Sequence, residues 1–335
     1  MLNDLDVAEL KNYLPPRDEP ADFSSFWQQS IADARQWPLN ARFNPIKTYL
    51  KAIDSFDVEF AGYGGQNVRG WLNVPHERSG PLPCVVEYIG YGGGRGMAQE
   101  WLLYSAAGYA HFVMDSRGQG GAWRTGDTPD LAEAVSPHYP GFTTLGVSSP
   151  RDYYYRRLSI DAVRAVEAAR TSELIDPDRV AVAGNSQGGG TAIAAAGLVE
   201  NLLAVMPGVP FMCHISRAIR ITDALPYFEI TRYLRANPLR REQTLDTLSY
   251  FDGVNFAARA KAPALFSVAL MDQTCPPSTV YAAYNHYAAP KDIRVWEFND
   301  HDGAAPQQAV ENLRFLDELA SAGAVASSPS GSSRK

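Results

Sequence analysis

The sequence predicts an α/β protein built on a mostly parallel sheet with helices on both faces. Short apolar runs, of the length of buried strands, alternate along most of the 335 residues with segments of helical periodicity. Parallel strands need long crossover connections, and such helices supply them. One interval between two expected strands, at residues 206–263, is too long for a plain crossover and indicates an inserted helical cap.

A helix and a β-hairpin are expected before this alternation begins. Asp22 can cap a helix that runs from residue 23 to about residue 35, and residues 1–46 are expected to form an N-terminal helical extension. Residues 49–60 and 68–74 have β character and flank the glycine-rich stretch 62–65, which predicts a hairpin.

The alternating region then gives the expected elements of the sheet and its cover. Strands are expected at residues 84–89, 110–114, 179–183, 202–205, 264–270 and 293–298, and helices at 99–107, 158–170, 188–199, 280–287 and 310–319.

The domain organisation follows from these elements. We expect one domain over residues 1–320, with a helical insertion at 207–262 that walls an active site and has helices at 215–224, 227–235 and 240–250. The serine-rich residues 321–335 are expected to form a disordered tail.

Composition and charge exclude several classes of protein. Lys and Arg number 30 and Asp and Glu 37, so the net charge is −7, which disfavours non-specific nucleic-acid binding. No run of 18 apolar residues predicts a membrane span, and the acidic N-terminus resembles no secretory signal. The three cysteines Cys84, Cys213 and Cys275 match neither a disulfide framework nor a zinc site, so we expect reduced thiols in a cytoplasmic protein.

The strongest chemical signal is Gly184-Asn185-Ser186-Gln187-Gly188, which reads G-x-S-x-G. The string alone is weak, but here an expected strand precedes it and an expected helix follows it. A strand, a sharp turn and a helix form the nucleophile elbow of α/β-hydrolases, which exposes the serine hydroxyl at the carboxyl edge of the sheet. The alternative is a glycine-rich turn without chemistry.

A serine nucleophile needs a base, and the base needs an acid to orient it. His301 follows an expected strand on a loop at the carboxyl edge, whereas His286 lies in an expected helix and has a surface or packing role. Asp272 follows the preceding strand and is preferred as the acid. Asp300 and Asp302 flank His301 directly and are badly placed to reach its ring.

The loop after the first buried strand is the expected source of an oxyanion donor. It reads Gly90-Tyr91-Gly92-Gly93-Gly94-Arg95-Gly96, and its glycines let backbone amides approach a ligand. A dinucleotide fingerprint is excluded, because Arg95 or Met97 stands where its third glycine belongs. We expect the amides of Tyr91 and Gln187 to form the oxyanion hole.

At these residues the chain resembles the acetyl xylan esterase/cephalosporin C deacetylase family, carbohydrate esterase family 7, within the α/β-hydrolase superfamily. The segments that carry the resemblance are Arg117-Gly118-Gln119, Gly184-Asn185-Ser186-Gln187-Gly188-Gly189, Asp272 with Cys275-Pro276-Pro277-Ser278-Thr279, and His301 followed by an acid. The resemblance implies Ser186, Asp272 and His301 as catalytic triad, the Tyr91 and Gln187 amides as oxyanion hole, and a cytoplasmic hexamer. Two positions depart from the family pattern, Ile89 where histidine is usual and Asp302 where glutamate is usual.

The remaining interpretations concern the surroundings of the triad. Arg117 and Gln119 are expected to support the loop behind the nucleophile, with substrate contact as the alternative for Arg117. Phe211 and Pro226, with the Tyr91 ring, are expected to floor a shallow acetyl slot. The apolar residues 211–215 and the hairpin are expected to offer surface for a hexamer.

The function that follows is hydrolysis of O-acetyl esters of small carbohydrates and of cephalosporin C, with no metal or organic cofactor. A general short-chain carboxylesterase or a serine peptidase on the same scaffold remains an alternative, because either would share the triad. A non-catalytic binding protein is a third reading, and it would be expected to have lost a member of the triad.

Overall fold

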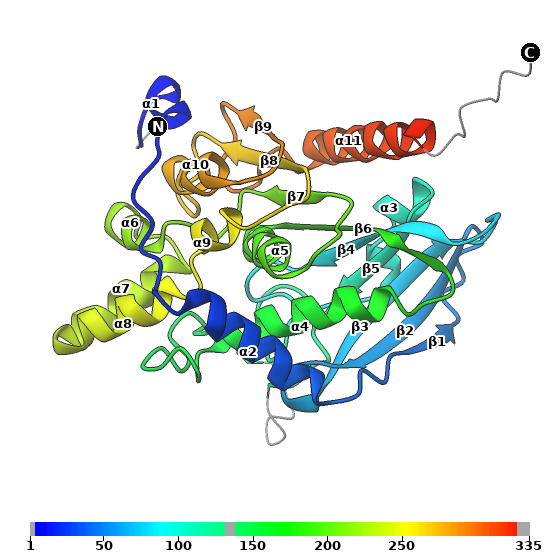
Figure 1. Ribbon diagram of the computed structural model, residues 1–335, viewed down its shortest axis with the longest axis horizontal. Helices are drawn as coiled ribbons and strands as arrows, with labels where there is room; N and C mark the ends of the chain where they lie inside the picture. Colours follow the sequence, from blue (N-terminus) through cyan, green and yellow to red (C-terminus); the bar gives the residue numbers. More distant parts are fainter. Residues whose placement is uncertain (1–3, 131–137, 327–335) are drawn as a thin grey trace, which may run out of the picture.

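A nine-stranded mixed sheet forms the centre of the computed structural model, which describes residues 4–130 and 138–326 (Figure 1). The strand order is β1-β2-β3-β5-β4-β6-β7-β8-β9. The strands are β1 (Arg42–Ile46), β2 (Ile53–Ala61), β3 (Asn67–Pro75), β4 (Leu82–Tyr88), β5 (Ala110–Met114), β6 (Ile175–Asn185), β7 (Val205–Gly208), β8 (Ala264–Ala269) and β9 (Lys291–Trp296). Pairing is antiparallel from β1 to β5 and parallel from β5 to β9, which confirms the mostly parallel sheet.

Helices cover both faces of this sheet. They are α1 (Val7–Lys11), α2 (Phe23–Arg35), α3 (Leu103–Ala106), α4 (Tyr154–Ala169), α5 (Gln187–Leu198), α6 (Ile215–Ile221), α7 (Tyr227–Ala236), α8 (Arg241–Ser249), α9 (Gly253–Ala257), α10 (Pro277–His286) and α11 (Ala305–Ala326). Successive residues of a strand point to opposite faces. Val86 and Val182 therefore join the main core with α4 and α5, whereas Val85 and Ala183 join a second cluster with Leu316 of α11.

The N-terminal segment ends in a strand that the sequence did not predict. Residues 4–41 contain α1 and α2 as expected, but β1 pairs with β2 at the edge of the sheet. β1 has no apolar run, and it contains Pro45, which an edge strand tolerates because one side needs no partner. The expectation of a purely helical extension over residues 1–46 is therefore wrong for its last residues.

Two further elements differ from the expected ones. In place of a helix at 99–107 there is a 3-10 turn, η2 (Ala98–Glu100), followed by the short α3. The Asn73 side-chain amide donates to the carbonyls of Ala98 and Trp101, both at 2.8 Å, and so competes with the helical ladder. β7 begins at Val205, where its pairing with Val182 starts, three residues later than expected.

The last helix is longer than expected. α11 runs to Ala326, so the first part of the expected tail is helical, and residues 327–335 lie outside the described residues. Within the described part of the chain, no helix combines the length and the apolarity that crossing a membrane requires.

The long interval between β7 and β8 holds helices, as predicted. α6, α7, α8 and α9 lie there together with a 3-10 turn, η3 (Pro238–Arg240). The stretch 211–215 that precedes α6 does not offer the apolar surface expected of it. It contains Phe211, Met212, Cys213 and Ile215, which are buried in the main core of the same chain.

Candidate active site

Ser186 lies in a sharp turn between β6 and α5. Its backbone has a φ of 56° and a ψ of −121°, a conformation that L-residues rarely adopt. A Cβ on Gly188 would lie 2.1 Å from the Tyr88 carbonyl oxygen, and a Cβ on Gly184 would lie 2.7 Å from that atom. The flanking glycines are therefore required by the crowding of the turn, and the turn exposes Ser186 to a cavity at the carboxyl ends of the parallel strands.

Hydrogen bonds join Ser186 to His301 and Asp272. The distance from His301 Nε2 to Ser186 Oγ is 2.9 Å, and the distance from His301 Nδ1 to Asp272 Oδ2 is 2.8 Å. The Asp272 side chain is fully buried, and its Oδ1 accepts hydrogen bonds from the amides of Thr274 and Cys275. The backbone thus fixes the carboxylate, and the carboxylate fixes the imidazole with Nε2 toward the serine.

Neither acid beside His301 forms a hydrogen bond with its ring in the described part of the chain. Asp300 and Asp302 are exposed, and Oδ1 of Asp302 accepts hydrogen bonds from the Ala304 amide and the Asn299 side chain. These bonds, that of Ala304 first, lower the pKa of Asp302. The structure therefore brings Asp272, and not its rivals, to the imidazole.

His286 and Cys275, for which the sequence predicted no catalytic role, have structural surroundings. His286 Nε2 lies 2.7 Å from the Pro15 carbonyl oxygen, away from the cavity. Cys275 is buried, and burial raises the pKa of its thiol well above the ordinary value. Its Sγ and one potential metal-ligand atom each of Asp272 and His301 lie within 4.8 Å of one another. A protonated thiol is a poor metal ligand, however, and Asp272 and His301 are already hydrogen-bonded to each other.

Two backbone amides are placed to serve as oxyanion donors. The Gln187 amide opens α5 directly after Ser186, where the helix dipole favours negative charge. Tyr91 lines the cavity on the loop after β4. Among the hydrogen bonds of the described residues, neither amide donates to another protein group. Both are therefore free to bind a developing oxyanion.

The cavity above Ser186 has a volume of about 930 Å³ and is walled by the sheet edge, the loops and the cap. Leu225, Pro226, Glu229, Arg232 and Tyr233, from α7 and the residues before it, belong to its lining. Phe211 is not among the lining residues, contrary to expectation. It is fully buried and packs behind the Tyr91 ring, with the two ring centroids 6.3 Å apart.

Comparisons with known proteins identify the family of this chain. The family described as acetyl xylan esterase (AXE1) matches residues 1–319. The chain belongs to the acetyl xylan esterase family. The predicted family is thereby confirmed. An acetyl xylan esterase from Paenibacillus sp. R4 is 40% identical with a TM-score of 0.87, over 94% of this chain and 99% of that chain.

More distant relatives extend the comparison. Acetyl xylan esterase 1 from Thermoanaerobacterium sp. JW/SL YS485 is 29% identical with a TM-score of 0.82, over 92% of this chain and 99% of that chain. Acetyl esterase Axe7A of Xylanibacter ruminicola is 25% identical over 86% of this chain, which spans 64% of that relative's length. An acylaminoacyl peptidase from Pyrococcus horikoshii, 16% identical with a TM-score of 0.56, shares the fold, over 80% of this chain and 41% of that chain. The α/β-hydrolase fold is therefore confirmed.

In this acetyl xylan esterase family member, Arg117 lies behind the site and does not line the cavity. Its buried guanidinium binds both oxygens of Asp161 on α4, and it also reaches Gln66 at 2.8 Å and Asp130 at 3.3 Å. The guanidinium binds carboxylates and an amide oxygen of the protein itself. These contacts favour a supporting role for Arg117 over contact with the substrate.

Gln119 connects the oxyanion loop to the elbow. Its Oε1 accepts a hydrogen bond from the Gly92 amide at 2.6 Å, and its Nε2 donates to Gln187 Oε1 at 2.8 Å. Gln187 Nε2 in turn donates to the Ile89 carbonyl at 3.1 Å. The two glutamine side chains therefore hold the two candidate oxyanion donors in one network.

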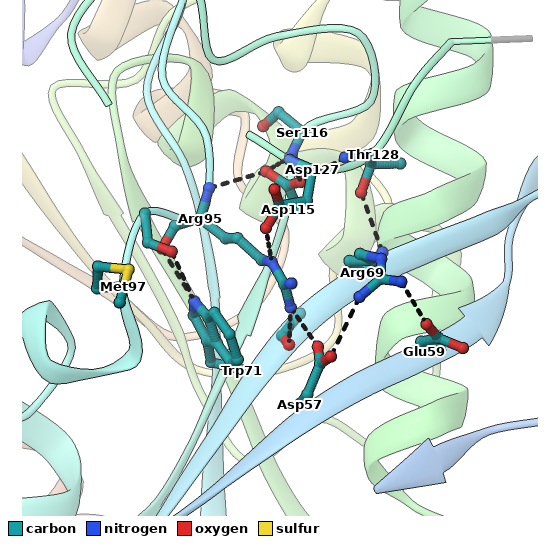
Figure 2. A network of polar contacts seen from close by, with 12 residues as sticks. Asp57, Glu59, Arg69, Trp71, Arg95, Met97, Asp115, Ser116, Asp127 and Thr128 are labelled. Carbon is teal, nitrogen blue, oxygen red and sulfur yellow. Dashed lines mark hydrogen bonds and ion pairs between the residues drawn. The ribbon is translucent and has the colours of Figure 1, made fainter. Parts of the chain in front are cut away.

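The far end of the oxyanion loop is anchored by Arg95 (Figure 2). Its buried guanidinium binds Asp57 of β2 at 2.5 Å and Asp127 at 2.8 Å, and it stacks on the Trp71 ring of β3. The amide of Arg95 donates to the buried Asp115, whose pKa is raised by burial. Contacts with β2 and β3 therefore fix the position of this end of the loop.

Among the cavity residues that sequence reasoning missed, two contact Tyr91. Trp123 lines the cavity, and its indole N–H donates to the Tyr91 carbonyl at 2.8 Å. Glu229 of α7 lines the cavity and contacts the Tyr91 hydroxyl. Neither residue belongs to a local motif, and only their position in an insertion or a glycine-rich loop could have drawn attention to them.

Proposed function

We propose that this protein is a serine esterase that hydrolyses O-acetyl esters of small carbohydrates, acetylated xylo-oligosaccharides foremost, and of cephalosporin C. The observation that carries the proposal is the hydrogen-bonded series from Ser186 through His301 to Asp272, open to the cavity. Its family membership and the printed names of its relatives support acetyl esters as substrates.

The proposed reaction has two steps. Ser186 Oγ attacks the acetyl carbonyl while His301 Nε2 takes the hydroxyl proton, and the amides of Tyr91 and Gln187 stabilise the resulting oxyanion. His301 then gives that proton to the departing alcohol oxygen, which leaves an acetyl-enzyme. A water molecule, deprotonated by His301, attacks the acetyl group, and collapse of the second tetrahedral intermediate returns the proton to Ser186 and releases acetate.

The chain itself supplies every group that this reaction uses. Nucleophile, base, orienting acid and oxyanion donors are all present, so the proposal needs no metal or organic cofactor. It also includes a cytoplasmic location, which the reduced cysteines support, and a hexameric assembly.

A panel of esters tests the proposal. Acetylated xylo-oligosaccharides, cephalosporin C and simple aryl acetates are compared side by side by their kcat/KM. We expect all three to be hydrolysed, with Ser186 labelled by a serine-directed organophosphonate. Equal turnover of long-chain esters would favour a general carboxylesterase, and hydrolysis of peptide amides alone would favour a peptidase.

A further inference from the structure

A carboxylate of the cap lies against the candidate oxyanion loop. Glu229 sits on α7, half-buried in the cavity wall, and both of its oxygens lie within hydrogen-bond distance of the Tyr91 hydroxyl, at 2.8 and 2.7 Å. Its Oε2 also accepts hydrogen bonds from the Thr143 hydroxyl at 2.6 Å and the Thr143 amide at 3.3 Å. The cap and two loops therefore meet at one side chain.

The other partners of the Tyr91 hydroxyl determine which group donates in its contact with Glu229. The Tyr91 hydroxyl accepts from the amides of Gly141 and Phe142, at 3.0 and 2.9 Å, which uses both of its acceptor positions. Its single proton is left for Glu229. Among the described residues, every hydrogen-bond partner of Glu229 is thus a donor. Burial, and next the Glu229 carboxylate, raise the pKa of Tyr91, so the phenol keeps its proton.

The loop that carries Tyr91 needs such a restraint. Three glycines follow Tyr91 directly, and glycine gives a backbone the most freedom to move. The Tyr91 residue is held at three points: its carbonyl by Trp123, its ring between Phe142 and Phe211, and its hydroxyl by Glu229. The contact with Glu229 links Tyr91 directly to the cap helix α7.

We propose that Glu229 is a positioning residue that holds Tyr91 so that its amide faces the oxyanion, which makes the cap part of transition-state stabilisation. The inference rests on the proposed function. An oxyanion forms only along the reaction path, so a misplaced donor slows the reaction without weakening substrate binding. Loss of one complete oxyanion donor costs about 10²–10³ in kcat, and a displaced donor costs part of that.

A different role for Glu229 would be direct contact with sugar hydroxyls. Its oxygens already accept bonds from two hydroxyls and an amide within the chain, which leaves little capacity for a ligand. The two roles separate experimentally, because a residue that binds the sugar acts on KM and only for sugar esters.

The experiment compares Glu229→Gln with Glu242→Gln, a matched change at an exposed residue of α8. Both are assayed with an aryl acetate and an acetylated xylo-oligosaccharide, and thermal unfolding checks that each variant is folded. We expect Glu229→Gln to lower kcat about 10- to 100-fold on both esters with KM changed less than about threefold, and Glu242→Gln to match the wild type.

Two further measurements distinguish positioning from general loosening of the cap. An aryl trifluoromethyl ketone forms a hemiketal oxyanion with the serine, and its affinity should fall by the same factor as kcat. Tyr91→Phe removes the hydroxyl through which Glu229 acts, so the double variant should be no slower than the slower single variant.

Several results would overturn the inference. These are an unchanged kcat in folded Glu229→Gln, a rise in KM confined to sugar esters, an unchanged inhibitor affinity, or additive effects in the double variant. A wild-type protein that hydrolyses no acetyl ester would overturn the proposed function, and this inference with it. Wild-type activity that Glu229→Gln leaves intact overturns the inference alone.

Discussion

At the scale of single residues, the site combines a strained serine with a rigidly held acid. Ser186 has a positive φ that the glycines around it permit, and its hydroxyl meets the imidazole at 2.9 Å. Asp272 is immobilised by two amides before it contacts the histidine. The backbone holds Ser186 and Asp272 in place. Substitution of these side chains should therefore change kcat far more than the free energy of unfolding.

Removal of the nucleophile is the first prediction. Ser186→Ala should lower kcat by on the order of 10⁶, which leaves only the oxyanion hole and substrate binding. Steady-state kinetics on an aryl acetate checks this, with unfolding by urea as the control for stability. Wild-type activity in the variant would contradict the whole mechanism.

The orienting acid gives the second prediction. Asp272→Asn should keep the fold but lower kcat by roughly 10⁴, because the amide favours the wrong tautomer of His301. Asp302→Asn is the matched control and should change kcat little, since Asp302 is exposed and forms no hydrogen bond with the ring in the described part of the chain. A reversed order of the two effects would show that the acid was wrongly chosen.

At the scale of elements, the cap forms part of the cavity wall and also contacts the N-terminal segment. Leu225 and Pro226, which directly precede α7, line the cavity. The segment before α6 connects the cap to the N-terminal residues, where His214 Nδ1 lies 3.3 Å from the Tyr13 hydroxyl.

The acyl slot yields the third prediction. If Tyr91 and Pro226 close it, an added methylene must displace packed atoms, which typically costs 1–3 kcal/mol, instead of gaining up to about 0.8 kcal/mol. Aryl acetate should therefore exceed aryl butyrate at least about tenfold in kcat/KM, and octanoate should be nearly inert. Comparable rates for the three esters would indicate an open slot and a general carboxylesterase.

The fourth prediction concerns acid stability and His214. Burial, and next the charge of Arg217, lower the pKa of His214 from 6.5 to about 4. Between these two pKa values the unfolded chain binds a proton at His214 that the folded chain does not bind. The contribution of His214 to the free energy of unfolding is therefore full above pH 6.5 and is lost as the pH falls toward 4. The loss should be on the order of 1 kcal/mol, since His214 is partly open to solvent.

Urea unfolding of the wild type and of His214→Asn at pH 7 and pH 4.5 measures this effect. Asparagine suits the left-handed backbone at this position, where φ is 44°. The difference between the two proteins cancels the titration of other groups. We expect the variant to lose less stability than the wild type between the two pH values, and an equal loss would refute the assignment.

At the scale of the whole molecule, exposed apolar side chains are the candidates for an interface between chains. Phe211, Met212, Cys213 and Ile215 are buried within one chain, but large apolar side chains are exposed elsewhere. Tyr49 after β1 is 78% exposed, and Phe298 after β9 is 75% exposed, so both edges of the sheet carry such groups.

The fifth prediction is the hexamer that the resemblance to the family implies. Light scattering should give a mass near six times 36.7 kDa. Phe298→Ser and Tyr49→Ser, each at one edge of the sheet, would show which edge takes part. A clean monomer at micromolar concentration would contradict the assembly and any size filter derived from it.

The sequence by itself determined the order of the elements and indicated the three residues of the proposed triad. Ser186 directly follows β6, and Asp272 and His301 lie on the loops that follow β8 and β9. Short runs of apolar residues predict such strands from the local sequence. Because the carboxyl ends of parallel strands meet at one edge, local pattern was enough to bring three distant residues together. The helices of the cap were predictable for the same reason.

Only the tertiary structure decided what surrounds the triad. The contact of Tyr91 with Glu229 spans 138 positions, and it depends on how the cap folds over the sheet. β1 forms because the edge of the sheet offers it hydrogen bonds. Within the helix expected at 99–107, the Trp101 carbonyl bonds to Asn73 of β3 in place of a helical amide. The residues in such contacts lie far apart along the chain, and the local sequence contains no pattern that predicts them. Their interactions form only once the chain has folded.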